Sequence, residues 1–251
     1  MEYFTDDKIA GRNPVLEALR SGRVIDKLFV QKDLNDGIIV KICAMARDAG
    51  VVISRVERQK LDHMTVAAHQ GVVAAVAMHG YAEVEDILSR AEQAGEAPFI
   101  IIAEEISDPH NLGSIIRTAC CCGAHGVIIP KNRAVGLSSI VTKVSAGAVE
   151  YTPVARVVNI ARTISELQQK GVWVIGGDER AEQLYYNIDY RGAIAIVIGN
   201  EGKGISRLAK EKCDFLVSIP SKGEISSLNA SVAAAALMLE AAKQRQVIGN
   251  K

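Results

Sequence analysis

Residues 215 to 243 read FLVSIPSKGEISSLNASVAAAALMLEAAK, and three kinds of sequence follow one another within them. The first part, 215–219, is apolar and ends at Pro220. Because proline cannot donate to a continuing ladder, we predict a buried strand that ends there. Residues 221–227 are polar, as in a loop. The alanine-rich run 228–243 predicts a helix.

The junction between this loop and this helix is rich in small polar residues. Ser226, Ser227 and Asn229 lie at a helix start, where backbone N–H groups lack partners within the helix. Serine and asparagine are favoured N-caps, so capping alone can explain them. Two other segments have the same form, a strand followed by a polar loop, and we therefore interpret the three together.

Length and charge set the broad class. A chain of 251 residues suits one large or two small domains. Its formal net charge of zero argues against binding nucleic acid through bulk charge but leaves a local basic patch open. The run Cys120–Cys122 lies in a helical pattern and suits reduced packing residues in a cytosolic protein.

Several classes of protein are disfavoured. The cysteines and histidines show no CxxC or HxxxH spacing, so we expect no metal site. Residues 1–7 are acidic and have no apolar signal region, and every apolar run is too short to span a bilayer. We therefore expect a cytoplasmic protein with no membrane segment.

The chain falls into three regions. Residues 1–80 predict a small α/β domain, in which Asn13 caps a helix that begins at Pro14. Residues 81–97 are acidic and predict a linker. From 98 to 251, short apolar strands alternate with helices, which indicates a parallel sheet covered on both faces. The predicted strands are 99–103, 127–129, 152–157, 172–175, 193–198 and 215–219, and the predicted helices are 111–123, 138–147, 159–170, 205–212 and 228–245.

Two further polar loops follow predicted strands. The first, ISDPHNLGSIIRTA at 106–119, has Asn111 at a helix start and Arg117 six residues later. Capping and a solvated helix face explain each of these residues taken alone. The second, IAIVIGNEGKGI at 194–205, has three glycines, which permit unusual dihedrals and close approach of a ligand to backbone N–H groups. A tight turn explains the glycines but not the carboxylate of Glu201 among them.

The glycine spacing helps to exclude other nucleotide folds. It reads G-x-x-G-x-G after a late strand, unlike the G-x-G-x-x-G dinucleotide fingerprint, and no P-loop is present. Ligands of parallel sheets bind beyond the carboxyl ends of the strands, so the three loops can converge on one edge. One shared site would then gather five polar residues, which are Asn111, Arg117, Glu201, Ser227 and Asn229.

The three loops also carry a family resemblance. In order, D-P-x-N-x-G-x-I-x-R-T-A, I-G-N-E-G-x-G and I-P-x-x-G-x-x-x-S-L-N-x-S resemble the signature motifs of the SpoU (TrmH-like) 2'-O-ribose RNA methyltransferases of the SPOUT superfamily. The match covers 98–245. The sequence GRNPV at 11–15 resembles the small substrate-binding domain of the branch that methylates a guanosine in bacterial 23S rRNA. Ala230 departs from the valine of many members, and Ser221-Lys222 from a commoner Met-small pair.

This resemblance implies a fold and an activity. The fold is a C-terminal parallel-sheet SPOUT domain at 98–251 with a trefoil knot, preceded by a small α/β RNA-binding domain at 1–80. The activity is transfer of a methyl group from S-adenosylmethionine to a ribose 2'-oxygen, with 23S rRNA as the RNA partner and a homodimer as the working form. The backbone implied to hold the adenosyl group lies around Gly176, Gly199, Ile219 and Leu228.

The resemblance also implies residue roles. Asn111, Arg117, Glu201, Ser227 and Asn229 match the family's functional positions. A guanidinium is effectively always protonated, so we interpret Arg117 as a cation that holds the target phosphate and favours the alkoxide, while a phosphate oxygen or water takes the proton. Glu201 orients Arg117 or lies near the sulfonium. Ser227 and Asn229 fix the ribose and methionine ends.

Four alternatives stay open. One, a nucleotide-binding oxidoreductase, is disfavoured by the glycine spacing G-x-x-G-x-G. The nearest is a tRNA 2'-O-methyltransferase of the same family. A non-catalytic RNA-binding relative is disfavoured because all five polar positions are kept. A Rossmann-type methyltransferase is disfavoured because no glycine-rich loop follows the strand predicted at 99–103.

Overall fold

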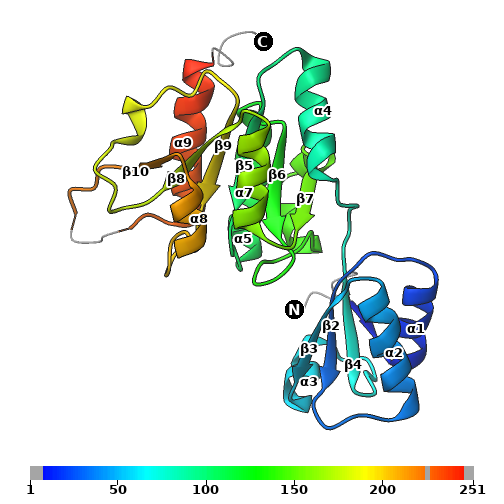
Figure 1. Cartoon of the computed structure of the whole chain (residues 1–251). Coiled ribbons are helices and arrows are strands. Elements are labelled where there is room, and N and C mark those ends of the chain that lie inside the picture. Colours follow the sequence, from blue (N-terminus) through cyan, green and yellow to red (C-terminus); the bar gives the residue numbers. More distant parts are fainter. Residues whose placement is uncertain (1–7, 224–226, 246–251) are drawn as a thin grey trace. The chain divides into compact units, whose positions relative to one another are not determined.

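A computed structural model describes residues 8–223 and 227–245, which form two compact units (Figure 1). The N-terminal unit holds Met1–Gly80 together with Gly136–Ser139, and the C-terminal unit holds Tyr81–Val135 and Ile140–Lys251. Ser226, one of the polar residues at the predicted helix start, lies outside the described residues.

The N-terminal unit is built on a four-stranded mixed sheet with the order β1-β4-β2-β3. Strand β2 is parallel to β3, while β4 is antiparallel to both β1 and β2. Apolar side chains of β2 and β4 pack with those of α1 and α2 into one core. The elements are β1 (Lys8–Ala10), α1 (Arg12–Arg20), β2 (Ile25–Gln31), α2 (Gly37–Asp48), β3 (Val52–Val56), α3 (Arg58–Met64) and β4 (Val72–Val76).

The start of α1 differs from the prediction. Gly11 is the N-cap, with a φ of 99°, and the helix begins at Arg12. The backbone N–H of Arg12 donates to Gln70 Oε1 at 3.2 Å, so a distant side chain does the work of a local cap. The prediction that Asn13 caps the helix was therefore wrong, because a long-range contact replaces the local one.

The C-terminal unit is built on six strands that are all parallel, in the order β10-β8-β9-β5-β6-β7. The central strands β5, β6 and β9 are buried along their whole length, as expected for a sheet covered on both faces. The strands are β5 (Phe99–Ala103), β6 (Gly126–Pro130), β7 (Val154–Val157), β8 (Trp173–Gly177), β9 (Ile194–Ile198) and β10 (Phe215–Val217).

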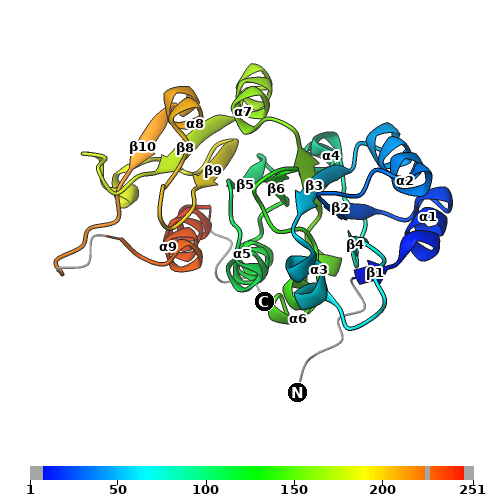
Figure 2. The ribbon, with the colours of Figure 1, turned by 90° about the horizontal axis from the view of Figure 1, so that it is seen from below.

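Helices cover both faces of this sheet. Figure 2 shows α5 and α9 on one face and α7 and α8 on the other, and α4 packs into the same core as α7 and α8. This layering confirms the predicted α/β architecture. The helices are α4 (Val84–Ala94), α5 (Pro109–Cys121), α6 (Ser139–Val144), α7 (Ile160–Gln169), α8 (Arg207–Lys212) and α9 (Ala230–Gln244), with short 3-10 helices at Ala148–Glu150 and Tyr185–Asn187.

Helix α4 lies where the sequence predicted a linker over 81–97. Ile87 and Ala91 are fully buried in the core of the C-terminal unit. A Cβ on Gly126 would come within 2.5 Å of Ile87, so the two positions fit closely. The acidic residues that suggested a linker belong to the solvent face of an amphipathic helix.

No helix of residues 8–223 and 227–245 is both long enough and apolar enough to cross a membrane. Within the same ranges, the acidic, histidine and cysteine side chains form no group that could hold a metal ion. The trefoil knot stays a prediction, because the connection into α9 includes residues 224–226.

Candidate active site

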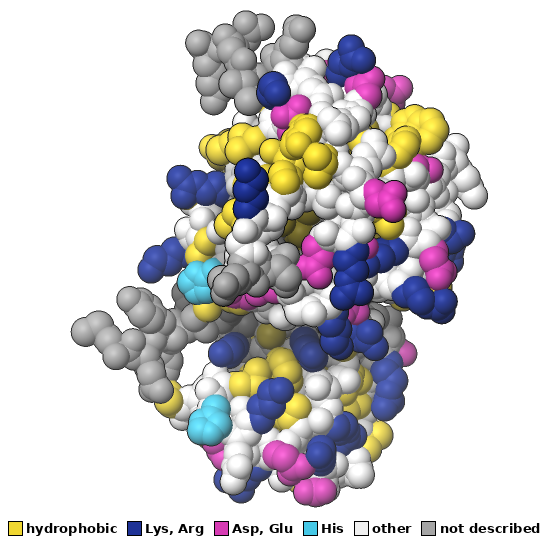
Figure 3. All heavy atoms as spheres, turned by 90° about the vertical axis from the view of Figure 1, so that its left-hand side faces the viewer, with side chains coloured by type: hydrophobic (Ala, Val, Ile, Leu, Met, Phe, Trp, Pro, Cys, Tyr) yellow, Lys and Arg dark blue, Asp and Glu magenta, His cyan; other side chains and the backbone are white. Residues whose placement is uncertain are grey.

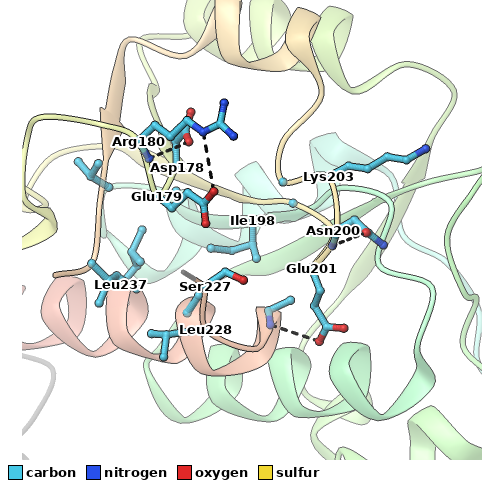
Figure 4. A pocket seen from close by; sticks show the side chains of 18 of the residues that line it. Asp178, Glu179, Arg180, Ile198, Asn200, Glu201, Lys203, Ser227, Leu228 and Leu237 are labelled. Carbon is cyan, nitrogen blue, oxygen red and sulfur yellow. Dashed lines mark hydrogen bonds and ion pairs between the residues drawn. The ribbon is translucent and has the colours of Figure 1, made fainter. Parts of the chain in front are cut away.

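A cavity of about 330 Å³ lies beyond the carboxyl ends of β8, β9 and β10 (Figure 4). The loops that leave these strands form its walls, together with the first turns of α9. Figure 4 shows Asp178, Glu179 and Arg180 on one side, with Ser227 and Leu228 across from them. This edge is where parallel sheets bind ligands, and the cavity is of ligand size.

Three of the five predicted polar residues meet at the rim of this cavity. Asn111 donates from Nδ2 to Glu201 Oε1 at 2.6 Å, and Asn229 donates from Nδ2 to the same oxygen at 2.5 Å. Asn229 Nδ2 also lies 3.0 Å from Asn111 Oδ1. Asn111 lies in the first turn of α5, Glu201 in the loop after β9 and Asn229 at the start of α9, so the three predicted segments converge in the fold.

Glu201 receives a third donor from the helix start. The backbone N–H of Ala230 points to Glu201 Oε1 at 3.4 Å. The other carboxylate oxygen, Oε2, makes no hydrogen bond with the described part of the chain. One oxygen of Glu201 is thus held by the protein, while the other is free to face a ligand in the cavity that Glu201 lines.

Arg117 is in neither the cluster nor the cavity lining, whereas Ser227 lines the cavity. Six residues advance an α-helix by roughly 600°, so Arg117 points roughly 120° round α5 from Asn111. Its side chain is exposed and pairs with none of residues 8–223 and 227–245. The predicted orientation of Arg117 by Glu201 is therefore absent within one chain.

The loop after β9 is shaped by one glycine that cannot be replaced. A Cβ on Gly199 would lie 2.1 Å from the carbonyl carbon of Gly204, because the loop folds back onto its own start. Asn200 and Gly204 exchange backbone hydrogen bonds of 3.2 and 2.7 Å across this turn. Gly204 itself has a φ of 64°, which favours glycine.

Three hydrogen bonds connect this loop to the residues that follow β5. The carboxylate of Glu104, which is buried, accepts from the backbone N–H of Ser206 at 2.9 Å and from its Oγ at 2.7 Å. The side chain of Asn200 donates to the backbone oxygen of Glu105 at 3.2 Å. These contacts hold Glu201 in place, and the sequence motifs gave no sign of the role of Glu104.

The predicted cofactor residues divide into two groups. Gly199, Ile219 and Leu228 line the cavity, as does Ser227. Gly176 does not line it. A Cβ there would come within 2.9 to 3.0 Å of the side chains of Leu216, Cys213 and Ile205, while its neighbour Gly177 lines the cavity.

An ion pair in the cavity wall was missed by the sequence analysis. Lys210 Nζ of α8 lies 2.5 Å from Asp178 Oδ2, and the Asp178 side chain is only 11% exposed. Burial alone would raise the pKa of Asp178, but hydrogen bonds from Lys210 and the Arg180 backbone outweigh it and leave the pKa below its usual value. The signal was the polar run at 178–180, which is separated from the predicted strand 172–175 by two glycines.

The cavity fits the S-adenosylmethionine that the family resemblance implies. Ile198, Val217, Ile219 and Leu237 supply apolar walls suited to an adenine ring. The ionised carboxylate of Asp178 can accept hydrogen bonds from ribose hydroxyls. Glu201 adds another carboxylate to the lining, which can stabilise a positively charged group of a ligand.

Two family matches cover most of the chain. Residues 98–239 match the SpoU rRNA Methylase family, and residues 8–82 match the family described as RNA 2'-O ribose methyltransferase substrate binding. The relative YacO of Bacillus subtilis (strain 168), whose name places it among TrmH family tRNA/rRNA methyltransferases, is 49% identical over 97% of this chain and 98% of its own.

Solved structures agree with this assignment. The SpoU methyltransferase AviRb from Streptomyces viridochromogenes, in complex with the cofactor AdoMet, is 26% identical and has a TM-score of 0.61 over 96% of this chain and 90% of its own. An rRNA methyltransferase from Sinorhizobium meliloti is 26% identical, with a TM-score of 0.59 over 97% and 88%. Together with the cavity, these matches show that this chain belongs to the SpoU (TrmH-like) family of RNA 2'-O-ribose methyltransferases, which take their methyl group from S-adenosylmethionine.

Proposed function

We propose that this enzyme methylates the 2'-oxygen of a guanosine in 23S rRNA. The observation that carries the proposal is the cluster of Asn111, Glu201 and Asn229 at the rim of the methyl-donor cavity. The front sequence GRNPV at 11–15 favours the 23S branch of the family. A second candidate substrate is tRNA, which the names of the curated relatives include beside rRNA.

The bound methyl donor supplies an electrophilic methyl group on a sulfonium. In the reaction the sulfur–carbon bond breaks, a bond from carbon to the ribose 2'-oxygen forms, and the hydroxyl proton leaves to a phosphate oxygen or to water. Because the displacement is in line, holding the ribose against the cavity supplies much of the rate. Ser227 and Asn229, at the cavity and its rim, are placed to hold the reacting ends.

Glu201 and Arg117 carry the charges of this scheme. Glu201 lies near the sulfonium and is kept in position by Asn111 and Asn229. Arg117 binds the target phosphate and favours the alkoxide. Its side chain has no partner among the described residues, which leaves all of its guanidinium donors for RNA.

The active form is a homodimer in this proposal. Helix α9 exposes Val232 and Leu239, each 51% exposed, with Ala235 and Ala236 between them on the same side. This spacing forms one apolar stripe along the helix, and the alanines allow another helix to approach closely. Helix α5, which carries Arg117, packs beside α9, so a second subunit on the stripe would bring an additional Arg117 close to the cavity.

The location that fits this substrate is the cytoplasm. All five cysteines are free in the structure, which suits a reducing compartment. Burial raises the pKa of the Cys122 thiol to about 11, so this member of the three-cysteine run is a packing residue. Cys121 is exposed on the same turn.

A transfer assay tests the proposal. The purified protein is mixed with S-adenosylmethionine labelled in its methyl group and, separately, with unmodified 23S rRNA, 16S rRNA and bulk tRNA. Each RNA is then digested to nucleosides. We expect label in 2'-O-methylguanosine from 23S rRNA. Label found only in tRNA would contradict the 23S rRNA assignment and favour tRNA as the substrate. Label on a base would contradict ribose methylation.

A further inference from the structure

A hollow of about 940 Å³ lies within the N-terminal unit. Among the described residues, it shares no lining residue with the methyl-donor cavity. It is formed by the start of α1, the chain from Gln31 to Ile38 and the loop 65–71 that leads into β4. Its size is within the range of ligand-binding sites, which is roughly 300–1,000 Å³. No residue predicted for methyl transfer lies in it.

The loop 65–71 is held in one conformation. The buried side chain of His69 accepts from the Gly71 backbone N–H at 2.9 Å and hydrogen-bonds Asp62 at 2.8 Å. Gln70 has a φ of 50°, which is uncommon for a residue with a side chain. Gly71 has a φ of 85°, a backbone conformation that favours glycine, and a Cβ there would also lie 2.0 Å from Leu34 Cδ1.

Arg12 ties this loop to the opposite wall of the hollow. Its Nε donates to the backbone oxygen of Gln70 at 3.2 Å, and its Nη2 lies 2.7 Å from Asp36 Oδ2. Its guanidinium is therefore used for structure and bridges the two walls. These contacts hold the C-terminal half of the loop, which lowers the entropic cost of ordering it around a ligand.

Other side chains at the hollow are open to solvent. The Arg58 side chain is 71% exposed, and its contact with Asp62 is long, at 3.9 Å. The side chain of Asn13, which does not cap α1, makes no hydrogen bond with any described residue. Val66 and Ile38 are 69% and 44% exposed, although both are aliphatic. The hollow thus combines exposed apolar side chains with a mostly exposed cation and an amide that has no side-chain partner among the described residues.

The charge of this unit points to an anionic partner. Residues 8–80 contain 11 Lys or Arg against 7 Asp or Glu, although the whole chain is neutral. On the face of this unit seen in Figure 3, Lys and Arg side chains gather around hydrophobic ones. Such a surface suits RNA whose bases are unstacked, since the apolar part takes a base and the cations take its phosphates.

We propose that this hollow binds one unpaired nucleotide of the substrate RNA, with its base against Val66 and Ile38 and its phosphate on Arg58. Asn13 supplies a hydrogen bond to the base edge or the sugar. The inference rests on the proposed function and adds where, and in what form, the N-terminal unit holds the RNA. It makes single-stranded loops, rather than continuous duplex, the target of this unit.

Binding of two labelled RNAs to the full-length protein tests this assignment. The probes are an RNA hairpin with an unpaired loop and a blunt duplex of the same stem, and affinity is followed by fluorescence anisotropy over a range of salt. Arg58→Ala and Val66→Asp change the hollow. Arg47→Ala and Val40→Asp, at exposed positions of α2 outside the hollow, are their matched controls.

The expected result is selective loss of hairpin binding. Arg58→Ala should weaken hairpin binding about tenfold and reduce the logarithmic salt slope by about 0.7, as for one lost phosphate contact on a single strand. Val66→Asp should weaken it about tenfold by placing a carboxylate beside the phosphate. Binding of the duplex by the hollow variants, and binding of either RNA by the two control variants, should change little.

Equal effects of the hollow variants and their controls would overturn the assignment, as would equal binding of hairpin and duplex by the wild type. The transfer assay keeps this outcome separate from the proposed function. If the wild type methylates 23S rRNA but the hollow variants bind the hairpin as well as their controls do, only the nucleotide site in the hollow is refuted. A wild type that binds the hairpin as expected but methylates no RNA refutes the proposed function.

Discussion

The side chain of Asn229 donates to Glu201 Oε1 at 2.5 Å while its own Oδ1 accepts from the backbone N–H of Ser231 at 2.9 Å. A flipped amide would place an oxygen against the carboxylate and an NH₂ group against the helix N–H, so both bonds fix one orientation. Helix capping and the active-site cluster are thus two functions of one side chain.

Replacing Asn229 by Asp separates these two functions. Aspartate keeps the cap, so the free energy of unfolding should fall by less than the roughly 1 kcal/mol expected for Asn229→Ala. Its charge repels Glu201, and methyl transfer should fall about 100-fold. Urea unfolding and single-turnover assays measure the two effects. Equal activity of Asn229→Asp and wild type would show that the hydrogen bond to Glu201 is not needed.

Arg117→Ala should abolish methyl transfer without affecting the methyl-donor cavity. The side chain has no partner among the described residues, so the fold does not depend on it. We expect turnover to fall at least about 100-fold with unchanged S-adenosylmethionine affinity by calorimetry. Arg162→Ala, on the exposed side of α7, is the control for loss of a surface charge. Unchanged turnover of Arg117→Ala would remove this residue from the mechanism.

Gly199 and Gly202, both in the loop after β9, provide a test variant and a matched control for close packing in that loop. Gly199→Ala puts a methyl group 2.1 Å from backbone and should lower the free energy of unfolding by about 1–3 kcal/mol and impair binding of the methyl donor. At Gly202 the nearest atom, Asn200 Oδ1, is 3.5 Å away, so Gly202→Ala should leave the fold stable. Urea titration compares them. Similar unfolding midpoints of Gly199→Ala and Gly202→Ala would mean that the loop can accommodate a methyl group at position 199.

The proposed dimer face predicts an effect of bulk on α9. Ala235→Trp should give monomers with low activity, because the ring separates helices that approach through alanines. Ala44→Trp places the same ring on an exposed position of α2 and should leave the assembly unchanged. Sedimentation reports the mass of each. An Ala235→Trp protein that remains dimeric and active would place the interface elsewhere.

The sheet and the convergence of its loops could be predicted because both depend on local sequence. Apolar runs such as Phe99–Ala103 are bounded by polar turns, and a parallel order sends every loop to the same edge. Asn111, Glu201 and Asn229 could be grouped on that basis alone. Family resemblance supplied the methyl donor and the ribose, which residue patterns by themselves did not.

Features that depend on distant contacts could not be predicted. The helix α1 begins after Gly11, and the Arg12 N–H at its start donates to Gln70, 58 residues away, which no local pattern indicates. The acidic residues of α4 made this segment resemble a linker in the sequence, and its apolar face is evident only from the position of Ile87 in the core. The pairing of Asp178 with Lys210 depends on how α8 packs beside β8, and the burial of Glu104 depends on the fold of the loop after β9.

Mapping of 2'-O-methyl groups tests the central claim most directly. Total rRNA and tRNA are compared from cells with the protein, without it, and without it but carrying either the wild-type or the Arg117→Ala form. The account predicts that one guanosine of 23S rRNA loses its 2'-O-methyl group with the protein, regains it with the wild type and stays unmethylated with Arg117→Ala. An unchanged 23S rRNA map, with loss confined to tRNA or with no loss at all, would contradict it.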